Sequence, residues 1–334
     1  MKTKNTHNHK LVSVILPTFN GQSTIFRAIS SIIKQNFKDW ELIIVDDCSD
    51  DKTVKIIKDI SSNDKRIKLI ESNTNSGGPA LPRTKAIKAS VGEYIMFIDQ
   101  DDMYLPNNIS NKISYLEEHQ EIEFITSLGW TYDTKRRKML SIEAHAPLNW
   151  AVKRKVFDDL GYFMQEQNGV DEFGFFYRYL TKNNLDKVPL IEDPLTIYFR
   201  HENQNSITNA RDPKIISQRY KSLLPNANQT TLNKKEKSKY FFRIGNYLCL
   251  DGNLKKGRQY LLKSYGLSPS PSSLLLFTTS LSSKSIYTKT EGFLRYLQNK
   301  VVKPIVMYKW LINKNISSKE IFKWISENED TRNN

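Results

Sequence analysis

Short apolar runs alternate with amphipathic stretches along the first part of the chain. Unbroken apolar runs are typical of strands that are buried on both faces of a parallel sheet. Four runs fit or approach this pattern: 11–16, 42–45, 66–70 and 94–98. Helical spacing follows between them, at 23–34, 53–60 and 83–89. Strands that alternate with helices in this way predict β-α-β units and a mostly parallel sheet.

Two loops are expected where strands give way to helices. The segment 17–21, Pro-Thr-Phe-Asn-Gly, has the composition of a turn, so the first strand is expected to end at Pro17. The segment 75–79, Asn-Ser-Gly-Gly-Pro, predicts a second loop that leads into the helix over 83–89.

Three carboxylates, Asp99, Asp101 and Asp102, follow the apolar run 94–98. Like charges crowded at a strand end raise each other's pKa, and a divalent cation would relieve their repulsion. Hard cations such as Mg²⁺ and Mn²⁺ take oxygen ligands of this kind. Taken alone, the cluster is explained equally well by a solvated turn in which Asp99 or Asp102 caps the next helix.

A second acidic strand end favours a functional interpretation. Asp46 and Asp47 directly follow the run 42–45, and open α/β sheets bind ligands at the carboxyl ends of their strands. Asp50 and Asp51 precede the helical stretch at 53 and are expected to cap it. Asp46 and Asp47 therefore stay as candidate binding residues.

Four motifs come in order: Val-Ile-Leu-Pro-Thr-Phe-Asn at 14–20, Ile-Val-Asp-Asp-Cys-Ser-Asp at 44–50, Asn-Ser-Gly-Gly-Pro-Ala at 75–80 with Arg83, and Gly-Glu-Tyr-Ile-Met-Phe-Ile-Asp-Gln-Asp-Asp at 92–102. Together they resemble the nucleotide-sugar half of a family 2 glycosyltransferase of the bacterial or archaeal surface-polysaccharide type. The resemblance implies an α/β catalytic domain with the GT-A, or nucleotide-diphospho-sugar transferase, fold. It also implies transfer of a sugar, with inversion, from a nucleoside diphosphate to an acceptor hydroxyl.

The resemblance implies a metal site at the fourth motif. Asp101 is the implied direct ligand of Mg²⁺ or Mn²⁺, Asp99 faces the ribose and the metal's waters, and Asp102 assists. The segment 198–206 resembles the ending of such a catalytic domain, and its His201 is a candidate for completing the metal shell. A lone histidine is more often structural.

The resemblance places the donor nucleotide at the first three motifs. Asp46 or Asp47 is implied to accept a hydrogen bond from the ring N–H of a uracil-like base, and Arg83 beside Gly78 is implied to reach the diphosphate. Thr84 stands where the family commonly has Asn, and a surface helix charge is the alternative reading of Arg83. The residues implied to line the base and ribose pocket are Pro17, Thr18 and Asn20.

The family's general base corresponds to Asp171 in the segment 169–178. Val170 stands where a Glu is expected, so Glu172 is an alternative register, and Asp171 as a helix N-cap is the structural alternative. Trp150 and Tyr162 are candidates for stacking on a sugar ring, although core aromatics are commoner.

The chain divides by composition. We expect a flexible N-terminus at 1–10, a catalytic domain at 11–210 with a nucleotide-sugar half (11–120) and an acceptor half (121–210), a helical region at 211–325 and a frayed tail at 326–334. The segment 239–269 resembles one tetratricopeptide-like helix pair. The segment 293–312 mixes lysines, aromatics and aliphatics, as does a basic helix on an anionic membrane. An ordinary amphipathic helix with a solvated basic face is the alternative.

Charge is segregated along the chain. Residues 214–334 contain 22 Lys and Arg against 7 Asp and Glu, a net charge of +15. Because the whole chain carries +14, residues 1–213 carry −1. Two cysteines, a polar start and the lack of a long apolar stretch predict a cytoplasmic protein with no membrane-spanning helix, peripheral at most at the inner face of the membrane.

Three other classes compete with a glycosyltransferase. A nucleic-acid binder would explain the basic tail but leaves both acidic strand ends unexplained, so no nucleic-acid partner is expected. A nucleotidyltransferase usually has a glycine-rich basic loop where this chain has Pro17-Thr18-Phe19-Asn20. A non-catalytic protein with a degenerate domain is the third alternative. The expected partners are a nucleoside-diphosphate sugar, expected to be UDP-linked in view of the acids at 46–47, a glycan or lipid-linked acceptor, and an anionic membrane surface.

Overall fold

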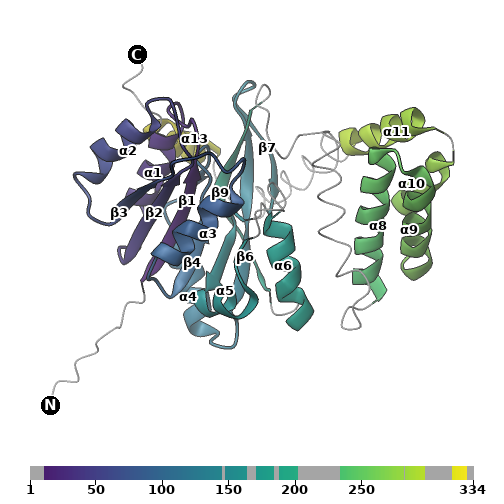
Figure 1. Cartoon of the computed structure of the whole chain (residues 1–334), viewed down its shortest axis with the longest axis horizontal. Coiled ribbons are helices and arrows are strands. Elements are labelled where there is room, and N and C mark those ends of the chain that lie inside the picture. The colour runs from purple at the N-terminus through teal and green to yellow at the C-terminus, as the bar shows by residue number, and fades with distance from the viewer. Residues whose placement is uncertain are drawn as a thin grey trace.

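The structure is a computed structural model that describes residues 11–144, 147–163, 171–183, 188–201, 234–281, 283–297 and 318–328. A sheet flanked by helices occupies the N-terminal part, and a group of helices follows it (Figure 1). The strands are β1 (Val12–Thr18), β2 (Trp40–Asp46), β3 (Ile67–Glu71), β4 (Tyr94–Phe97), β5 (Met103–Tyr104), β6 (Phe124–Asp133), β7 (Lys138–Glu143), β8 (Trp150–Lys153) and β9 (Leu190–Arg200). The helices around them are α1 (Ile25–Ile33), α2 (Thr53–Ser61), α3 (Ala80–Ala89), α4 (Asn108–Glu118), α5 (Arg154–Leu160) and α6 (Asp171–Lys182).

Within the described residues the strands form one sheet in the order β3-β2-β1-β4-β8-β6-β9-β5, with β7 paired to β6. The first four strands are parallel, as the alternating pattern predicted. The second half is mixed: β8 runs antiparallel to β4 and β6, β7 to β6, and β5 to β9. Antiparallel neighbours such as β6 and β7 can be joined by a short turn, whereas parallel neighbours need a crossover.

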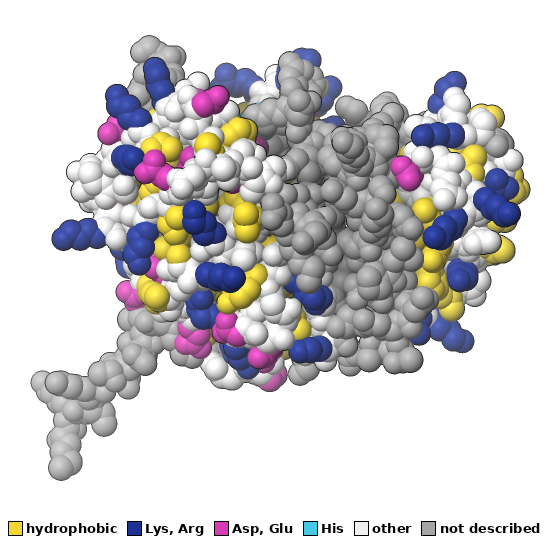
Figure 2. Space-filling model, viewed as in Figure 1, with side chains coloured by type: hydrophobic (Ala, Val, Ile, Leu, Met, Phe, Trp, Pro, Cys, Tyr) yellow, Lys and Arg dark blue, Asp and Glu magenta, His cyan; other side chains and the backbone are white. Residues whose placement is uncertain are grey.

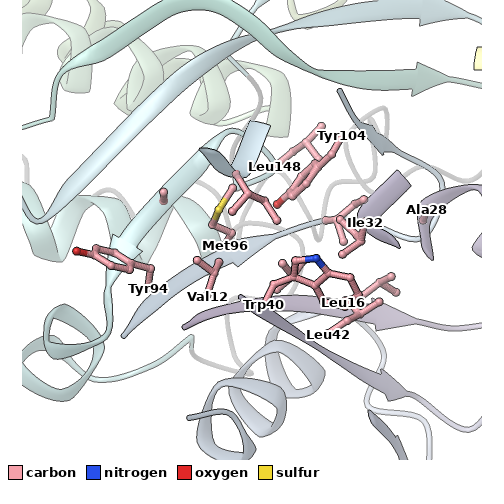
Figure 3. Close-up of a cluster of buried hydrophobic side chains, with 14 of the residues drawn as sticks. Val12, Leu16, Ala28, Ile32, Trp40, Leu42, Tyr94, Met96, Tyr104 and Leu148 are labelled. Atoms are coloured by element: carbon pink, nitrogen blue, oxygen red, sulfur yellow. The ribbon is translucent and has the colours of Figure 1, made fainter. Parts of the chain in front are cut away.

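Alternate residues of the central strands fill two cores. Ile15, Ile43 and Phe97 pack on one face with residues of α3, α5 and α6. Val14, Leu42 and Met96 pack on the other face with residues of α1, α2 and α4. Figure 3 shows Trp40, Leu42 and Met96 converging with Ala28 and Ile32 of α1 on this second face. The double burial explains why these strands read as continuous apolar runs.

The prediction that the first strand ends at Pro17 is wrong. β1 continues to Thr18, and Pro17 pairs with Val45 of β2. On its other side, β1 pairs with β4 only as far as Ile15. At Pro17 the side of β1 that faces β4 therefore needs no hydrogen bond to a neighbouring strand. A residue without an N–H is tolerated at such a position.

The helical C-terminal region predicted from composition is present. Its described helices are α8 (Lys234–Asp251), α9 (Leu254–Leu267), α10 (Pro271–Ser280), α11 (Lys284–Leu297) and α13 (Ser318–Asn328). α8 and α9 pack as a pair at the segment where a helix pair was expected. A Cβ atom on Gly245 would lie 2.8 Å from the Leu261 backbone nitrogen, so the two helices approach closely. The predicted N-terminus 1–10 and most of the segment 293–312 lie outside the described residues.

The frayed tail predicted from residue 326 is wrong at its start. α13 runs to Asn328, which is buried. Ile325 is also buried and packs in a cluster with residues of β5, β6 and β9. This contact with a distant part of the chain orders the helix, and sequence composition carries no sign of it.

Candidate functional site

The candidate residues gather because their strands end at one edge of the sheet. Thr18 is paired with Asp46 at the ends of β1 and β2. On the other side of β1, the backbone N–H of Ile98 donates to Ile15 O at 3.1 Å, which places Asp99 just beyond β4. Parallel strands thus bring three loops together, as predicted.

Gln100 joins two of these loops and was missed by the sequence reasoning. Its Oε1 accepts hydrogen bonds from Thr18 Oγ1 (2.6 Å) and from the backbone N–H of Phe19 (2.9 Å). Its Nε2 donates to Phe19 O at 3.1 Å. The side chain between Asp99 and Asp101 therefore fixes the loop that follows β1.

Asp46 and Asp47 tie strand ends to loops. The carboxylate of Asp46 accepts from the N–H and the hydroxyl of Ser49, at 2.9 and 2.5 Å. That of Asp47 accepts from the N–H and the hydroxyl of Ser76, both at 2.9 Å. Both aspartates are buried. They shape the two loops that face the site, and their implied contact with a base stays a prediction.

The loop after β1 is braced against the loop after β2. Asn20 has a positive φ of 48°, its N–H donates to Ser49 Oγ (2.9 Å), and its Oδ1 accepts from the N–H of Asp50 (3.0 Å). Asp51 Oδ1 accepts from the N–H of Thr53, the first residue of α2, at 2.8 Å. Asp51 therefore satisfies the first N–H of α2 from the position before Lys52, which is the N-cap residue, whereas Asp50 contributes its backbone.

Arg83 is a buried site residue, so the surface-charge alternative is wrong. Its guanidinium donates to Asp99 Oδ1 at 2.8 Å and lies 3.9 Å from Glu172 Oε2. Nearby, the hydroxyl of Thr84 donates to Phe163 O at 3.0 Å. Gly78 lies in the loop before α3, where its carbonyl accepts from the Ser76 hydroxyl at 3.0 Å. Arg83 thereby links the acidic motif to α6.

The alternative that Asp99 or Asp102 caps the next helix is wrong, because Asn107 is the N-cap residue of α4. Asp101 and Asp102 differ in their surroundings. Asp102 is 1 % exposed, and its Oδ1 accepts from the N–H of Phe199 at 3.0 Å. Burial raises the pKa of Asp102 well above its usual value, and the charges of Asp101 and Asp99 add to this. Burial, followed by the charge of Asp99, raises the pKa of Asp101 to about 6.

His201 lies opposite Asp101, with 3.9 Å between Nε2 and Asp101 Oδ2. Burial lowers the pKa of His201, and the nearby charge of Arg27 lowers it further. Arg27 was missed from the sequence: its guanidinium donates to Asp101 O at 2.7 Å and stacks 3.8 Å from the centre of the Phe199 ring. A single arginine on an amphipathic helix gives no signal of such a role.

The family model described as glycosyl transferase family 2 matches residues 13–185. The chain belongs to this family. A segment of 109 residues is 37% identical to the poly(ribitol-phosphate) beta-N-acetylglucosaminyltransferase TarS of Staphylococcus aureus, and it covers 32% of this chain and 19% of that protein. A segment of 106 residues is 40% identical to the UDP-Glc:alpha-D-GlcNAc-diphosphoundecaprenol beta-1,3-glucosyltransferase WfgD of Escherichia coli, covering 32% and 41%. The matched segments thus span about a fifth to two fifths of these relatives.

Solved structures share the fold. The S. aureus TarS fragment 1–349 in complex with UDP-GlcNAc aligns with a TM-score of 0.60 and 19% identity, over 85% of this chain and 91% of that one. The mannosyltransferase PcManGT of Pyrobaculum calidifontis, in complex with GDP-Man and Mn²⁺, aligns with a TM-score of 0.52 and 16% identity, over 87% of both chains. The family resemblance and the GT-A fold predicted from the sequence are therefore confirmed.

The donor atoms present in this family 2 chain fit a metal ion in part. Among the described residues, no group of three His, Cys, Asp or Glu side chains is arranged to hold a metal. Two buried atoms at the site, His201 Nε2 and Asp102 Oδ2, have no hydrogen-bond partner in the described parts of the chain. Asp101 and His201 offer one oxygen and one nitrogen, which suits an ion such as Mg²⁺ or Mn²⁺ that takes its other ligands from water and phosphate.

The structure bears differently on the three residues predicted for the acceptor side, Asp171, Trp150 and Tyr162. Asp171 is the first residue of α6, and its side chain lies outside the described residues. Trp150 is buried among aromatic rings such as Phe124 (5.0 Å between centroids), so its predicted stacking on a sugar is wrong. Tyr162 is half-buried, with Lys88 Nζ 5.1 Å from its ring centre. Its stacking role stays a prediction.

Proposed function

We propose that the protein is an inverting glycosyltransferase that moves a sugar from a UDP-sugar to an acceptor hydroxyl during synthesis of a cell-surface glycan. One observation carries the proposal: Arg83 joins Asp99, at the carboxyl edge of the parallel strands, to Glu172 at the start of α6. This contact supports a donor site and an acceptor site that would lie within the length of one side chain of each other.

Asp101 and His201 would hold a divalent cation at the donor site. Such an ion would supply neutralisation of the charge that develops on the leaving nucleoside diphosphate. Asp99 is oriented by Arg83, and Gln100 sets the loop at Thr18 and Phe19 against which the nucleoside would lie.

Asp171 is the proposed general base. The engagement of Glu172 with Arg83 supports this choice, because a carboxylate held by a guanidinium is a weaker proton acceptor. The Asp171 carboxylate would take the proton of the acceptor hydroxyl as the new glycosidic bond forms. The bond between the anomeric carbon and the diphosphate oxygen breaks in the same step, and the electron pair leaves with the nucleotide.

The nature of the substrates is supported by the relatives. TarS and WfgD are named as transferases of N-acetylglucosamine and glucose, and the WfgD acceptor is named as an alpha-D-GlcNAc-diphosphoundecaprenol. A glycan or lipid-linked acceptor and a UDP-hexose donor are therefore the substrates that we propose for this chain.

Attachment at the inner face of the cell membrane is the second part of the proposal. Among the described residues, none of the helices has both the length and the apolar character needed to cross a bilayer. Support for peripheral binding comes from residues 254–297, where Leu274 and Leu275 of α10 and Leu281 directly after it are exposed. Figure 2 shows yellow side chains among dark blue ones on the helical part of the chain. Exposed leucines on a part of the chain that also carries many basic side chains suit an anionic lipid surface.

A binding screen followed by paired variants tests the enzymatic proposal. Nucleoside diphosphates and their sugars are screened by thermal shift with and without Mn²⁺, and UDP with Mn²⁺ should give the largest stabilisation. Asp101→Asn should abolish that stabilisation. Asp171→Asn should keep UDP binding while turnover of the donor falls by roughly 10²–10⁴-fold.

The matched variant is Glu172→Gln, the neighbouring carboxylate on α6. If Glu172→Gln lost turnover while Asp171→Asn retained it, the base would be Glu172. If no nucleotide stabilised the wild-type protein, the transferase proposal itself would be wrong.

A further inference from the structure

The short strand β5 sets the position of the acidic motif. It follows Asp102 directly and contains only Met103 and Tyr104. It lies at the end of the strand order and pairs with β9. A two-residue edge strand has few ladder hydrogen bonds, so contacts on its free edge decide where it lies.

That free edge is closed by α1 and α13. The N–H of Leu105 donates to Leu195 O at 2.9 Å, toward β9, so the backbone groups of Tyr104 point the other way. The N–H of Tyr104 donates to Ser31 Oγ of α1 at 3.2 Å. Its carbonyl accepts from Trp324 Nε1 of α13 at 3.0 Å, across 220 positions of the sequence.

α13 also supports the end of β9. Ile325 is 3 % exposed and packs in one cluster with Met103, Ile197 and Phe199. The N–H of Phe199 is the group that donates to Asp102 Oδ1. The cluster therefore lies directly behind the strand segments that present Asp102 and His201.

α13 is itself held in place on α1. Lys34 Nζ donates to Glu327 O at 2.6 Å, and it lies 5.6 Å from the centre of the Trp324 ring. A lysine at the carbonyl end of a helix interacts favourably with the helix dipole. The side-chain amide of Asn328 donates to Trp324 O at 2.8 Å. The indole is thus held by its hydrogen bond to Tyr104 O and by the nearby Lys34 ammonium.

We propose that Trp324 and Ile325 are positioning residues of the donor site, which makes α13 part of the nucleotide-binding machinery. They hold β5 and the end of β9 so that Asp101, Asp102 and His201 keep the arrangement that receives a nucleoside diphosphate. The identity of that ligand rests on the proposed function. The contact between α13 and β5 is observed in the structure and does not depend on the proposed function.

Trp324→Phe tests the proposal, because it removes the indole N–H and keeps an aromatic ring. Ser326→Ala, at an exposed position of the same helix, is the matched control. Hydrogen–deuterium exchange of the ligand-free protein should become faster at 99–105 and 197–201 in Trp324→Phe and stay unchanged in β1 and β2. The dissociation constant of UDP with Mn²⁺, measured by calorimetry, should rise roughly three- to tenfold, as expected for one lost hydrogen bond.

Ile325→Val gives a second, milder variant that should change both readouts in the same direction. Exchange at 99–105 equal to that of Ser326→Ala would overturn the proposal. So would faster exchange with an unchanged dissociation constant, since α13 would then only stabilise the fold. A wild-type protein that bound no UDP would overturn the proposed function instead, and exchange alone would decide whether α13 holds β5.

Discussion

Side chains that were not singled out by a motif organise the site. Gln100 contacts the hydroxyl of Thr18 at the end of β1 and the backbone of Phe19, and Arg27 contacts the backbone of Asp101. The conspicuous acids Asp46 and Asp47 are occupied with serines of their own loops. At the scale of single residues, some of the side chains that shape the site are therefore not the ones that stand out in the sequence motifs.

Replacing Gln100 with Ala should weaken donor binding without unfolding the protein. The substitution removes three hydrogen bonds that hold Thr18 and Phe19, each contributing about 1 kcal/mol. We expect the dissociation constant of UDP to rise by about tenfold or more. Gln120→Ala, at an exposed position of the loop after α4, is the control. Equal affinity for UDP in both variants would contradict the role assigned to Gln100.

Metal binding should weaken as pH falls through about 6, because protons compete for Asp101, whose pKa burial and Asp99 raise to about 6. In the metal-free protein, a fall in pH has the opposite effect, because protonation of Asp101 increases the free energy of unfolding. The folded state holds the proton more tightly than the unfolded state, so this group's contribution to stability falls as pH rises from about 4 to 6. Titration of Mn²⁺ between pH 5 and 8, with Asp101→Asn as the control, measures the first effect. If the Mn²⁺ concentration at half-saturation did not change with pH, the predicted competition by protons would be contradicted.

At the scale of elements, α4 contains a buried group that the proposed reaction does not use. Lys112 is fully buried, and its Nζ has no hydrogen-bond partner among the described residues. The ammonium lies 5.8 Å from the centre of the Tyr104 ring. Burial alone lowers the pKa of Lys112 well below its usual value, so the helix retains this side chain at a cost in stability.

Lys112→Met should stabilise the protein by roughly 1–3 kcal/mol, because it removes an unsatisfied buried polar group. In the wild type, the free energy of unfolding should rise with pH toward about 10.4, where the unfolded lysine titrates. That rise should shrink in Lys112→Met. Lys55→Met on the exposed side of α2 is the control. Urea unfolding at pH 7 and 9 measures both effects, and a destabilised Lys112→Met would point to an interior partner for the ammonium.

At the scale of the whole molecule, the catalytic half and the helical region differ in charge. Residues 254–297, which span α9–α11, contain 7 Lys and Arg against 1 Asp or Glu. Their exposed leucines include Leu262 at 53 %, beside those of α10. A basic, partly apolar helical unit is what the proposed attachment to an anionic surface requires.

The double variant Leu274→Ser and Leu275→Ser should lower affinity for vesicles that contain phosphatidylglycerol by about tenfold, because apolar surface no longer enters the interface. Leu190→Ser, at a leucine of similar exposure in β9, is the control. Binding of the wild type should weaken as salt rises. Co-sedimentation with anionic and neutral vesicles measures this. Equal binding to both kinds of vesicle would contradict an electrostatic contribution.

The sequence alone determined the parallel half of the sheet, the helical C-terminal region and the family, because these depend on local patterns: apolar runs, helical spacing and four ordered motifs. It also brought the strand-end acids together, since parallel strands end at one edge. Only the tertiary structure decided the links between distant segments. The Arg83–Asp99 pair, the burial of Trp150 and the return of α13 to Tyr104 are such links. A local pattern shows which face of an element is apolar, but the partner that covers this face is chosen by packing across the whole chain.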